Sequence, residues 1–133
     1  MKEIGDLIKI SKFYGSDNRF VIAGGGNTSY KSIDRLWVKA SGASLATITE
    51  EGFAILDRAK LNLITEKVFS SNADEREEQV KRDLEEATLT KGKRPSVETS
   101  MHNAINYAFV VHLHPTLVNG LMSCLKMILL MKR

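Results

Sequence analysis

Residues 109–115 read Phe-Val-Val-His-Leu-His-Pro and combine a strand pattern with two histidines. Aromatic and β-branched residues favour a strand, and Pro115 cannot continue a hydrogen-bonded ladder, so we expect a strand over 109–114. Side chains alternate between the two faces of a strand, which places His112 and His114 on the same face. Two imidazoles so placed can bind one metal ion, of which zinc is the first candidate. Two ordinary histidines, packed or at the surface, are the alternative reading of this pattern alone.

Helical and extended patterns alternate through the rest of the chain. The spacing of apolar residues predicts helices over 2–13, 57–64, 75–88 and 97–107 and from 117 onward, and strands over 20–22, 36–40 and 53–56. We expect Asp74 and Ser96 to cap the helices that follow them, and loops over 70–73 and 90–95. This alternation, without an internal repeat, indicates an α/β layered domain.

The bulk composition favours an ordinary globular protein. The chain has 133 residues, 43% hydrophobic and 26% charged, which fits one domain with a real core. Its net charge of +3 is spread over mixed clusters such as residues 75–78, and this mixing argues against a nucleic-acid binder. The apolar stretch 117–131 is shorter than the roughly 20 residues of a membrane span, and Asn119 and Lys126 interrupt it.

The cysteine count and the N-terminus bear on localisation. Cys124 is the single cysteine, so no internal disulfide can form, and a free thiol fits a reducing compartment. Residues 1–4 begin no apolar signal sequence. We therefore expect a cytoplasmic protein that binds neither membranes nor nucleic acid.

Three polar segments are candidates for binding an anion. Residues 24–29 read Gly-Gly-Gly-Asn-Thr-Ser, where glycines let the backbone approach a ligand and the next three side chains add donors. The segment matches neither a Walker loop nor a dinucleotide fingerprint, and a flexible turn is the plainer reading. Ser41-Gly42 forms a second polar turn, and Ser96 lies at an expected helix N-terminus.

Glu98 is the candidate acid or base. It falls in the first turn of an expected helix, where a carboxylate also suits the helix dipole. The functional alternatives are a proton-transferring group or a metal ligand that substrate displaces. His102 lies four residues later, and we expect it to pack or to form a hydrogen bond rather than to bind metal.

These candidates match the needs of one reaction class. Retro-aldol cleavage of a ketose phosphate requires a Lewis acid for the developing negative charge, a carboxylate to move a proton, and donors that hold the phosphate. The sequence offers candidates for all three roles.

Four motifs in order (GGGNTS, LWVKASG, RPSVETSMH and VVHLHP) resemble the class II aldolase/adducin family. The nearest resemblance is to the N-terminal aldolase domain of bifunctional rhamnulose-1-phosphate aldolase/alcohol dehydrogenases, and it covers about residues 5–123. It implies a three-layer α/β/α domain around a mainly antiparallel sheet, over residues 1–124. It also implies a homotetramer with sites at subunit interfaces.

The resemblance assigns roles by position. His112 and His114 match zinc-binding histidines, and Glu98 matches the catalytic glutamate; zinc or another divalent metal is the implied cofactor. By the same resemblance, the phosphate-binding positions are Gly26, Asn27, Thr28, Ser41, Gly42 and Ser96. Where the family often has a second serine, this chain has Val97. The implied reaction is zinc-dependent cleavage of a ketose 1-phosphate, similar to rhamnulose 1-phosphate, to dihydroxyacetone phosphate and an aldehyde, in rhamnose catabolism.

The C-terminal part departs from the family pattern. The family's third zinc histidine lies downstream of the pair, and no histidine follows His114 in this sequence. Residues 125–133 form an atypical apolar and basic tail that resembles a truncated ending, so we expect a domain incomplete at its C-terminus. Two alternatives stay open: a non-catalytic remnant of the aldolase domain, and an enzyme similar to pentulose-phosphate 4-epimerases, which share the fold and the histidine pair.

Overall fold

The computed structural model describes residues 1–131, with side chains through residue 124. Among these residues, four strands form one sheet in the order β3-β2-β1-β4, and every neighbouring pair is antiparallel. The strand bounds are Asn27–Lys31 (β1), Arg35–Lys39 (β2), Phe53–Asp57 (β3) and Phe109–His112 (β4). The antiparallel sheet expected from the family resemblance is therefore confirmed.

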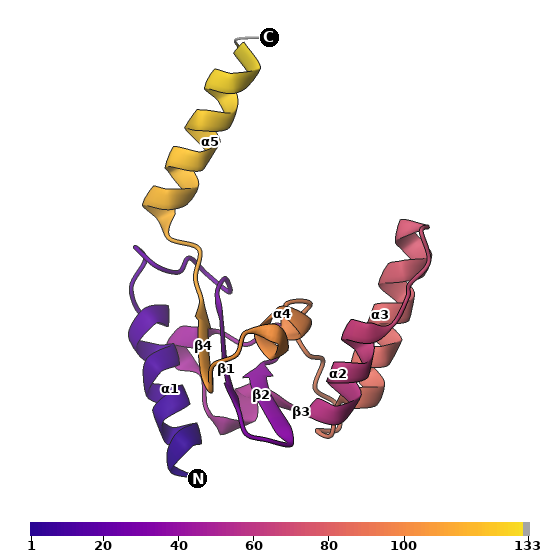
Figure 1. The fold of residues 1–133 in the computed structure, drawn as a ribbon. Coiled ribbons are helices and arrows are strands. Elements are labelled where there is room, and N and C mark those ends of the chain that lie inside the picture. The colour runs from indigo at the N-terminus through magenta and orange to yellow at the C-terminus, as the bar shows by residue number, and fades with distance from the viewer. Residues whose placement is uncertain (132–133) are drawn as a thin grey trace.

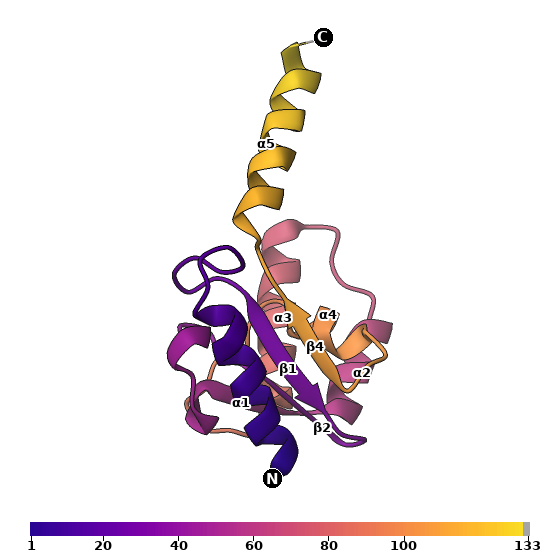
Figure 2. The ribbon, with the colours of Figure 1, turned by 90° about the vertical axis from the view of Figure 1, so that its left-hand side faces the viewer.

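Helices cover both faces of this sheet (Figure 1). The α-helices are Lys2–Gly15 (α1), Arg58–Glu66 (α2), Ala73–Ala87 (α3), Thr99–Ala104 (α4) and Thr116–Met131 (α5), and two short 3-10 turns, Leu45–Thr47 (η1) and Glu50–Gly52 (η2), precede β3. Helix α1 lies on one face, whereas α2, α3 and α4 lie on the other side of the sheet (Figure 2). The described residues thus form the expected α/β/α layers.

Two apolar clusters join the layers. On the α1 face, Ile4 and Leu7 pack with Trp37, Leu45 and Phe53. On the opposite face, alternate residues of β2 and β3 pack with residues of α2 and α3; this cluster contains Leu36, Val38, Ala54, Leu56, Leu61, Ile64, Leu84 and Ala87. Because β2 and β3 are buried on both faces, the sheet is the centre of the domain rather than one of its outer layers.

The strand expected over 20–22 is wrong. These residues follow a turn in which the amides of Phe20 and Val21 both donate to the carbonyl of Asp17, and no strand pairs with them. Val21 is 2% exposed and packs into the α1-side cluster. The apolar pattern therefore marks a loop anchored by one buried side chain.

Strand β1 was not predicted, because it begins within the segment that we interpreted as a glycine-rich turn. Only Gly24–Gly26 belong to the turn, and Asn27, Thr28 and Ser29 begin the strand. Asn27 disfavours a strand by propensity alone, but all three residues are almost fully buried and their side chains have hydrogen-bond partners. Tertiary contacts therefore outweigh local propensity here.

Two expected helix caps are also wrong. Asn72, not Asp74, caps α3: its side-chain oxygen accepts hydrogen bonds from the amides of Asp74 and Glu75. Helix α4 spans Thr99–Ala104 rather than 97–107, and Glu98 is its N-cap residue. Ser96 instead closes the preceding turn, where its hydroxyl accepts from the Glu98 amide at 3.3 Å and its carbonyl accepts from the Thr99 amide.

The C-terminal helix leaves the body of the domain. Figures 1 and 2 both show α5 extending away from the sheet beyond the end of β4. Thr116 ties its first turn to the loop before β1 through bonds to the carbonyls of Asn18 and Arg19. The prediction that residues 125–133 form an atypical, truncated tail falls on residues whose side chains lie outside the described part of the structure. Within the described part of the chain, no helix combines the length and apolarity needed to span a membrane.

Candidate metal centre

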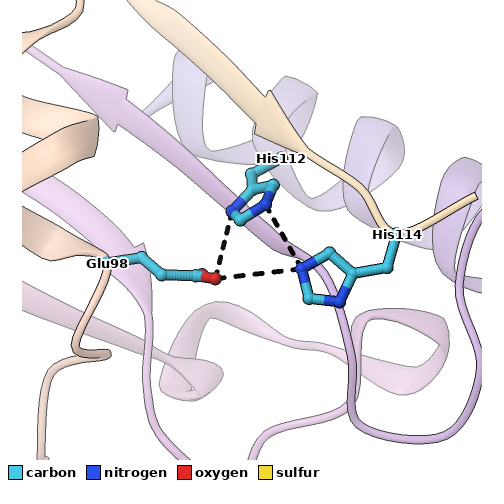
Figure 3. A group of neighbouring side chains, drawn as sticks. All are labelled: Glu98, His112 and His114. Carbon is cyan, nitrogen blue, oxygen red and sulfur yellow. Dashed lines mark hydrogen bonds and ion pairs between the residues drawn. The ribbon is translucent and has the colours of Figure 1, made fainter. Parts of the chain in front are cut away.

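Glu98, His112 and His114 converge on one point at the end of β4 (Figure 3). One donor atom from each lies within 4.8 Å of the other two. Glu98 Oε1 is 3.1 Å from His112 Nδ1 and 4.0 Å from His114 Nε2, and the two imidazoles approach to 3.2 Å through their Nε2 atoms. The expectation that both histidines point the same way is confirmed, although β4 ends at His112.

The end of β4 at His112 has a simple cause. His112 pairs with Asn27, the first residue of β1, so β1 offers no residue opposite positions 113 and 114. His114 extends from the loop next to the glycine turn, with Nδ1 3.9 Å from where a Cβ on Gly25 would lie. The pair therefore spans a strand end and a loop.

The donor set fits a divalent cation. His112 Nδ1 is buried without a hydrogen-bond partner, although the Glu98 carboxylate lies 3.1 Å away. The two groups thus approach without aligning as donor and acceptor, so a buried ring nitrogen beside the carboxylate keeps its capacity to bind a ligand. Two imidazole nitrogens and one carboxylate oxygen suit zinc and similar divalent metals. Side-chain exposures of 26–49% leave the point open to a substrate.

Asn27 holds the Glu98 carboxylate from the first position of β1. Its Nδ2 donates to Glu98 Oε2 at 3.0 Å, leaving Oε1 directed toward the histidines. Asn27 is 1% exposed, and its own Oδ1 has no hydrogen-bond partner. The structure therefore places Asn27 in contact with the carboxylate of Glu98.

His102 behaves as expected from its helical position. It is 0% exposed, and its Nδ1 pairs with the hydroxyl of Ser29 at 2.7 Å. Burial lowers the pKa of His102 to about 4, which keeps the ring neutral at neutral pH. Its ring centroid lies 6.3 Å from that of His112, so it packs behind the cluster rather than joining it.

The phosphate candidates occupy two separate places. Gly26 and Asn27 lie at the start of β1, and Gly26 adopts a φ of +70° that favours glycine. Ser41 and Gly42 form an exposed turn after β2, which an isolated bridge between Ala40 and Pro95 joins to the segment holding Ser96. Both segments lie at strand ends, since Gly26 precedes β1 and Ser41 follows shortly after β2.

The side chain of Thr28 does not join this group, which corrects its sequence assignment. Its hydroxyl pairs with that of Ser11 on α1 at 2.7 Å, and both residues are 0% exposed. Alternation along β1 turns Thr28 to the α1 face, whereas Asn27 and Ser29 face α4. Thr28 is also fully buried within the sheet, so it lies outside the group of candidate phosphate residues.

The sequence analysis did not identify two buried lysines that hold loop and helix carbonyls. Lys31 donates to the carbonyls of His102, Asn103 and Ile105 and so holds the C-terminal end of α4. Lys39 donates to the carbonyls of Ala43 and Gly24, and burial lowers the pKa of each lysine. Lysines within strand patterns suggest exposed positions, so local sequence gave no signal for these contacts.

The comparisons with known proteins find relatives that share this fold. A solved N-terminal class II aldolase domain of a conserved Thermoplasma acidophilum protein superposes with a TM-score of 0.73 at 31% identity, covering 86% of this chain and 55% of that one. A Bacillus subtilis (strain 168) protein described as uncharacterized oxidoreductase YuxG is 33% identical over 123 residues. That match covers 86% of this chain but only 17% of the relative.

The family model extends over nearly the whole sequence. It describes the class II aldolase and adducin N-terminal domain and matches residues 6–132. This range contains the glycine turn, the Ser41 turn, Glu98 and the histidine pair. The chain belongs to the class II aldolase and adducin N-terminal domain family.

Proposed function

We propose that this chain carries the metal-dependent aldolase centre of a protein that cleaves a ketose 1-phosphate into dihydroxyacetone phosphate and an aldehyde. Zinc is the metal we expect, and a rhamnulose 1-phosphate-like sugar of rhamnose catabolism is the substrate. The observation that carries the proposal is the convergence of Glu98, His112 and His114 on one point. Family membership supports an aldolase-type or related activity. A cytoplasmic location belongs to the same proposal and rests on the sequence.

The metal would be held by His112 and His114, with Glu98 as a third ligand before substrate arrives. A divalent cation bound there supplies a Lewis acid that stabilises the negative charge developing on the ketone oxygen. Glu98 is the only carboxylate in the described cluster, and its Oε1 faces the two histidines. Displacement by substrate would free this oxygen to transfer a proton.

Glu98 then has one clear task. It accepts the proton of the hydroxyl group on the carbon beyond the breaking bond. That hydroxyl becomes the carbonyl of the released aldehyde, and the electron pair of the carbon–carbon bond passes to the carbon beside the ketone. A proton returned to this carbon completes dihydroxyacetone phosphate. Asn27 keeps Oε2 occupied, so Oε1 is the oxygen directed at the substrate.

The decisive experiment couples metal analysis to product analysis. We expect the purified chain to bind one zinc per site and to release dihydroxyacetone phosphate from rhamnulose 1-phosphate. We expect His112→Ala to lose the zinc, and Glu98→Gln to lower kcat by at least about a hundredfold through loss of the proton-transferring group. The matched control is Glu66→Gln, which removes an exposed carboxylate at the end of α2 and should keep the wild-type rate.

The product distinguishes the alternatives. An epimerised pentulose phosphate instead of two fragments would replace the aldolase by an epimerase-like reaction. Zinc binding without turnover of either sugar would indicate a non-catalytic form of the domain. Absence of both zinc binding and turnover would reject the proposal for this chain.

A further inference from the structure

Arg94 is fixed beside the Ser41–Gly42 turn by contacts from both backbone and side chain. The amide of Ser41 donates to the Arg94 carbonyl at 2.9 Å, next to the bridge between Ala40 and Pro95. The guanidinium returns to the same turn, where Nη2 donates to Ser41 Oγ at 3.2 Å. Two segments more than fifty residues apart are thereby joined, with a cation at the junction.

The guanidinium of Arg94 keeps unused donors. It has five N–H groups, and the hydrogen bond to Ser41 uses one of them. Among the described residues, no carboxylate lies within ion-pair distance of it, and the residue is exposed. A planar guanidinium with free donors suits bidentate binding of a phosphate group.

A second cation contacts the residue that follows this turn. Lys39 is 5% exposed, and its ammonium donates to the Ala43 carbonyl at 2.9 Å and to the Gly24 carbonyl at 3.4 Å. Lys39 thus connects the Ser41–Gly42 turn to the glycine turn before β1. An anion at the Ser41–Gly42 turn would therefore lie near a buried cation as well as the exposed Arg94.

The turn also opens into a large surface cavity. The cavity has a volume of about 920 Å³, and Ser41, Arg94 and Ser96 contribute to one wall. Helix α3 forms the opposite wall and contributes the acidic residues Asp74, Glu77, Glu78 and Glu85 together with Arg76 and Lys81. Arg94 is the cation of the loop wall, whereas the α3 wall carries four carboxylates against two cations, so an anion in this cavity is favoured at the loop wall. Val97, 91% exposed at the same wall, offers no side-chain donor.

We propose that Arg94 binds the phosphate group of the substrate and makes the site selective for phosphorylated over neutral sugars. This inference rests on the proposed aldolase function for the identity of the substrate, but the anion site itself does not require the metal. Arg94 supplies positive charge and two parallel donors, while the Ser41 hydroxyl and the Gly42 amide supply uncharged donors. The residue acts on substrate binding and has no part in the bond-breaking step.

The test measures phosphate binding without metal chemistry. Inorganic phosphate is titrated calorimetrically into the whole chain in EDTA, for wild type, Arg94→Gln, Arg94→Lys and Lys91→Gln. Lys91 is an exposed cation of the same loop outside this cavity, so its variant matches the loss of charge. We expect Arg94→Gln to weaken binding about tenfold or more, Arg94→Lys to retain part of the affinity, and Lys91→Gln to match wild type.

Steady-state kinetics separate this inference from the proposed function. In a chain that cleaves ketose 1-phosphate, Arg94→Gln should raise KM by a similar factor and leave kcat and zinc affinity unchanged. Equal phosphate affinities for wild type and Arg94→Gln would overturn the role of Arg94, whatever the activity. Arg94-dependent phosphate binding in a chain that cleaves no ketose phosphate would support the anion site and reject the aldolase proposal instead.

Discussion

His102 shows how a single buried ring connects stability to pH. The folded protein holds it neutral with a pKa lowered from 6.5 to about 4, because burial disfavours the charged form. Between these two values the unfolded chain binds a proton that the folded chain does not. Stability therefore falls as the pH drops from about 6.5 to about 4 and levels off below that range.

We predict that this residue accounts for up to about 3 kcal/mol of the loss in unfolding free energy across that window. Urea unfolding at pH 7, 6 and 5 in EDTA measures the slope. His102→Gln should be less stable at pH 7, since it disturbs the bond to Ser29, but should show a much shallower pH dependence. A variant that keeps the full wild-type slope would contradict this assignment.

At Gly26, next to the site, the structure leaves no room for a side chain. Its φ is +70°, and an added Cβ would lie 3.0 Å from Val21 Cγ2 and 3.3 Å from the carbonyl of His112. We predict that Gly26→Ala destabilises the fold by about 1–3 kcal/mol and displaces His112. Gly24, with open space around it, is the control, and Gly24→Ala should change stability by less than about 0.5 kcal/mol. Thermal unfolding of both variants, with zinc titration, checks the prediction; equal effects would refute it.

At the scale of elements, α1 docks through its last residue. A Cβ on Gly15 would lie 2.4 Å from the backbone nitrogen of Ala46 in η1, a contact that backbone atoms cannot easily relieve. The helix can approach η1 this closely only because the residue is glycine. This docking also positions Ser11, which pairs with Thr28 of β1.

We predict that Gly15→Ala costs about 3 kcal/mol or more, or prevents folding, since α1 must move away from η1. Gly5→Ala in the same helix meets no atom within 4 Å and should stabilise it by up to about 1 kcal/mol through helix propensity. Chemical denaturation of the pair gives a direct comparison. A mild effect at Gly15 would show that the contact is not rigid.

At the scale of the whole molecule, α5 exposes an apolar surface. Leu117, Val118, Leu121 and Met122 are 74%, 51%, 57% and 62% exposed, although each is apolar. Figure 1 shows this helix extending away from the sheet, so no part of the described body covers it. Apolar area of this kind favours association with another surface. A homo-oligomer, which the family resemblance led us to expect, would provide such a surface.

We predict that the chain self-associates through α5 as its concentration rises. The double variant Leu117→Glu/Leu121→Glu should shift sedimentation profiles toward the monomer. Ile33→Glu/Val68→Glu, which changes two 95% exposed residues of the body in the same way, should sediment like wild type. A wild-type chain that stays monomeric at high micromolar concentration would contradict the prediction.

The sequence predicted correctly those elements that depend on local patterns, and it failed where contacts between residues distant in sequence decide the structure. Helix α1 and strands β2 and β3 were predicted nearly in place, because their apolar periodicity is local. Strand β1 was missed, since its polar residues are buried by partners from α1 and α4 that are distant in sequence. Asp74 was predicted as the cap of α3, but Asn72 suits that role equally well, and only the observed start of α3 distinguishes them.

The sequence alone was enough to indicate the family and the chemical groups: two histidines at strand spacing, a carboxylate at the start of an expected helix, and small polar turns. The tertiary structure decided which of these groups meet. It placed Glu98 Oε1 near both imidazoles, turned Thr28 to the opposite face, and brought Arg94 into contact with the Ser41 turn. The physical reason is that spacing fixes the direction of a side chain only within one element, whereas a site is formed where separate elements pack together.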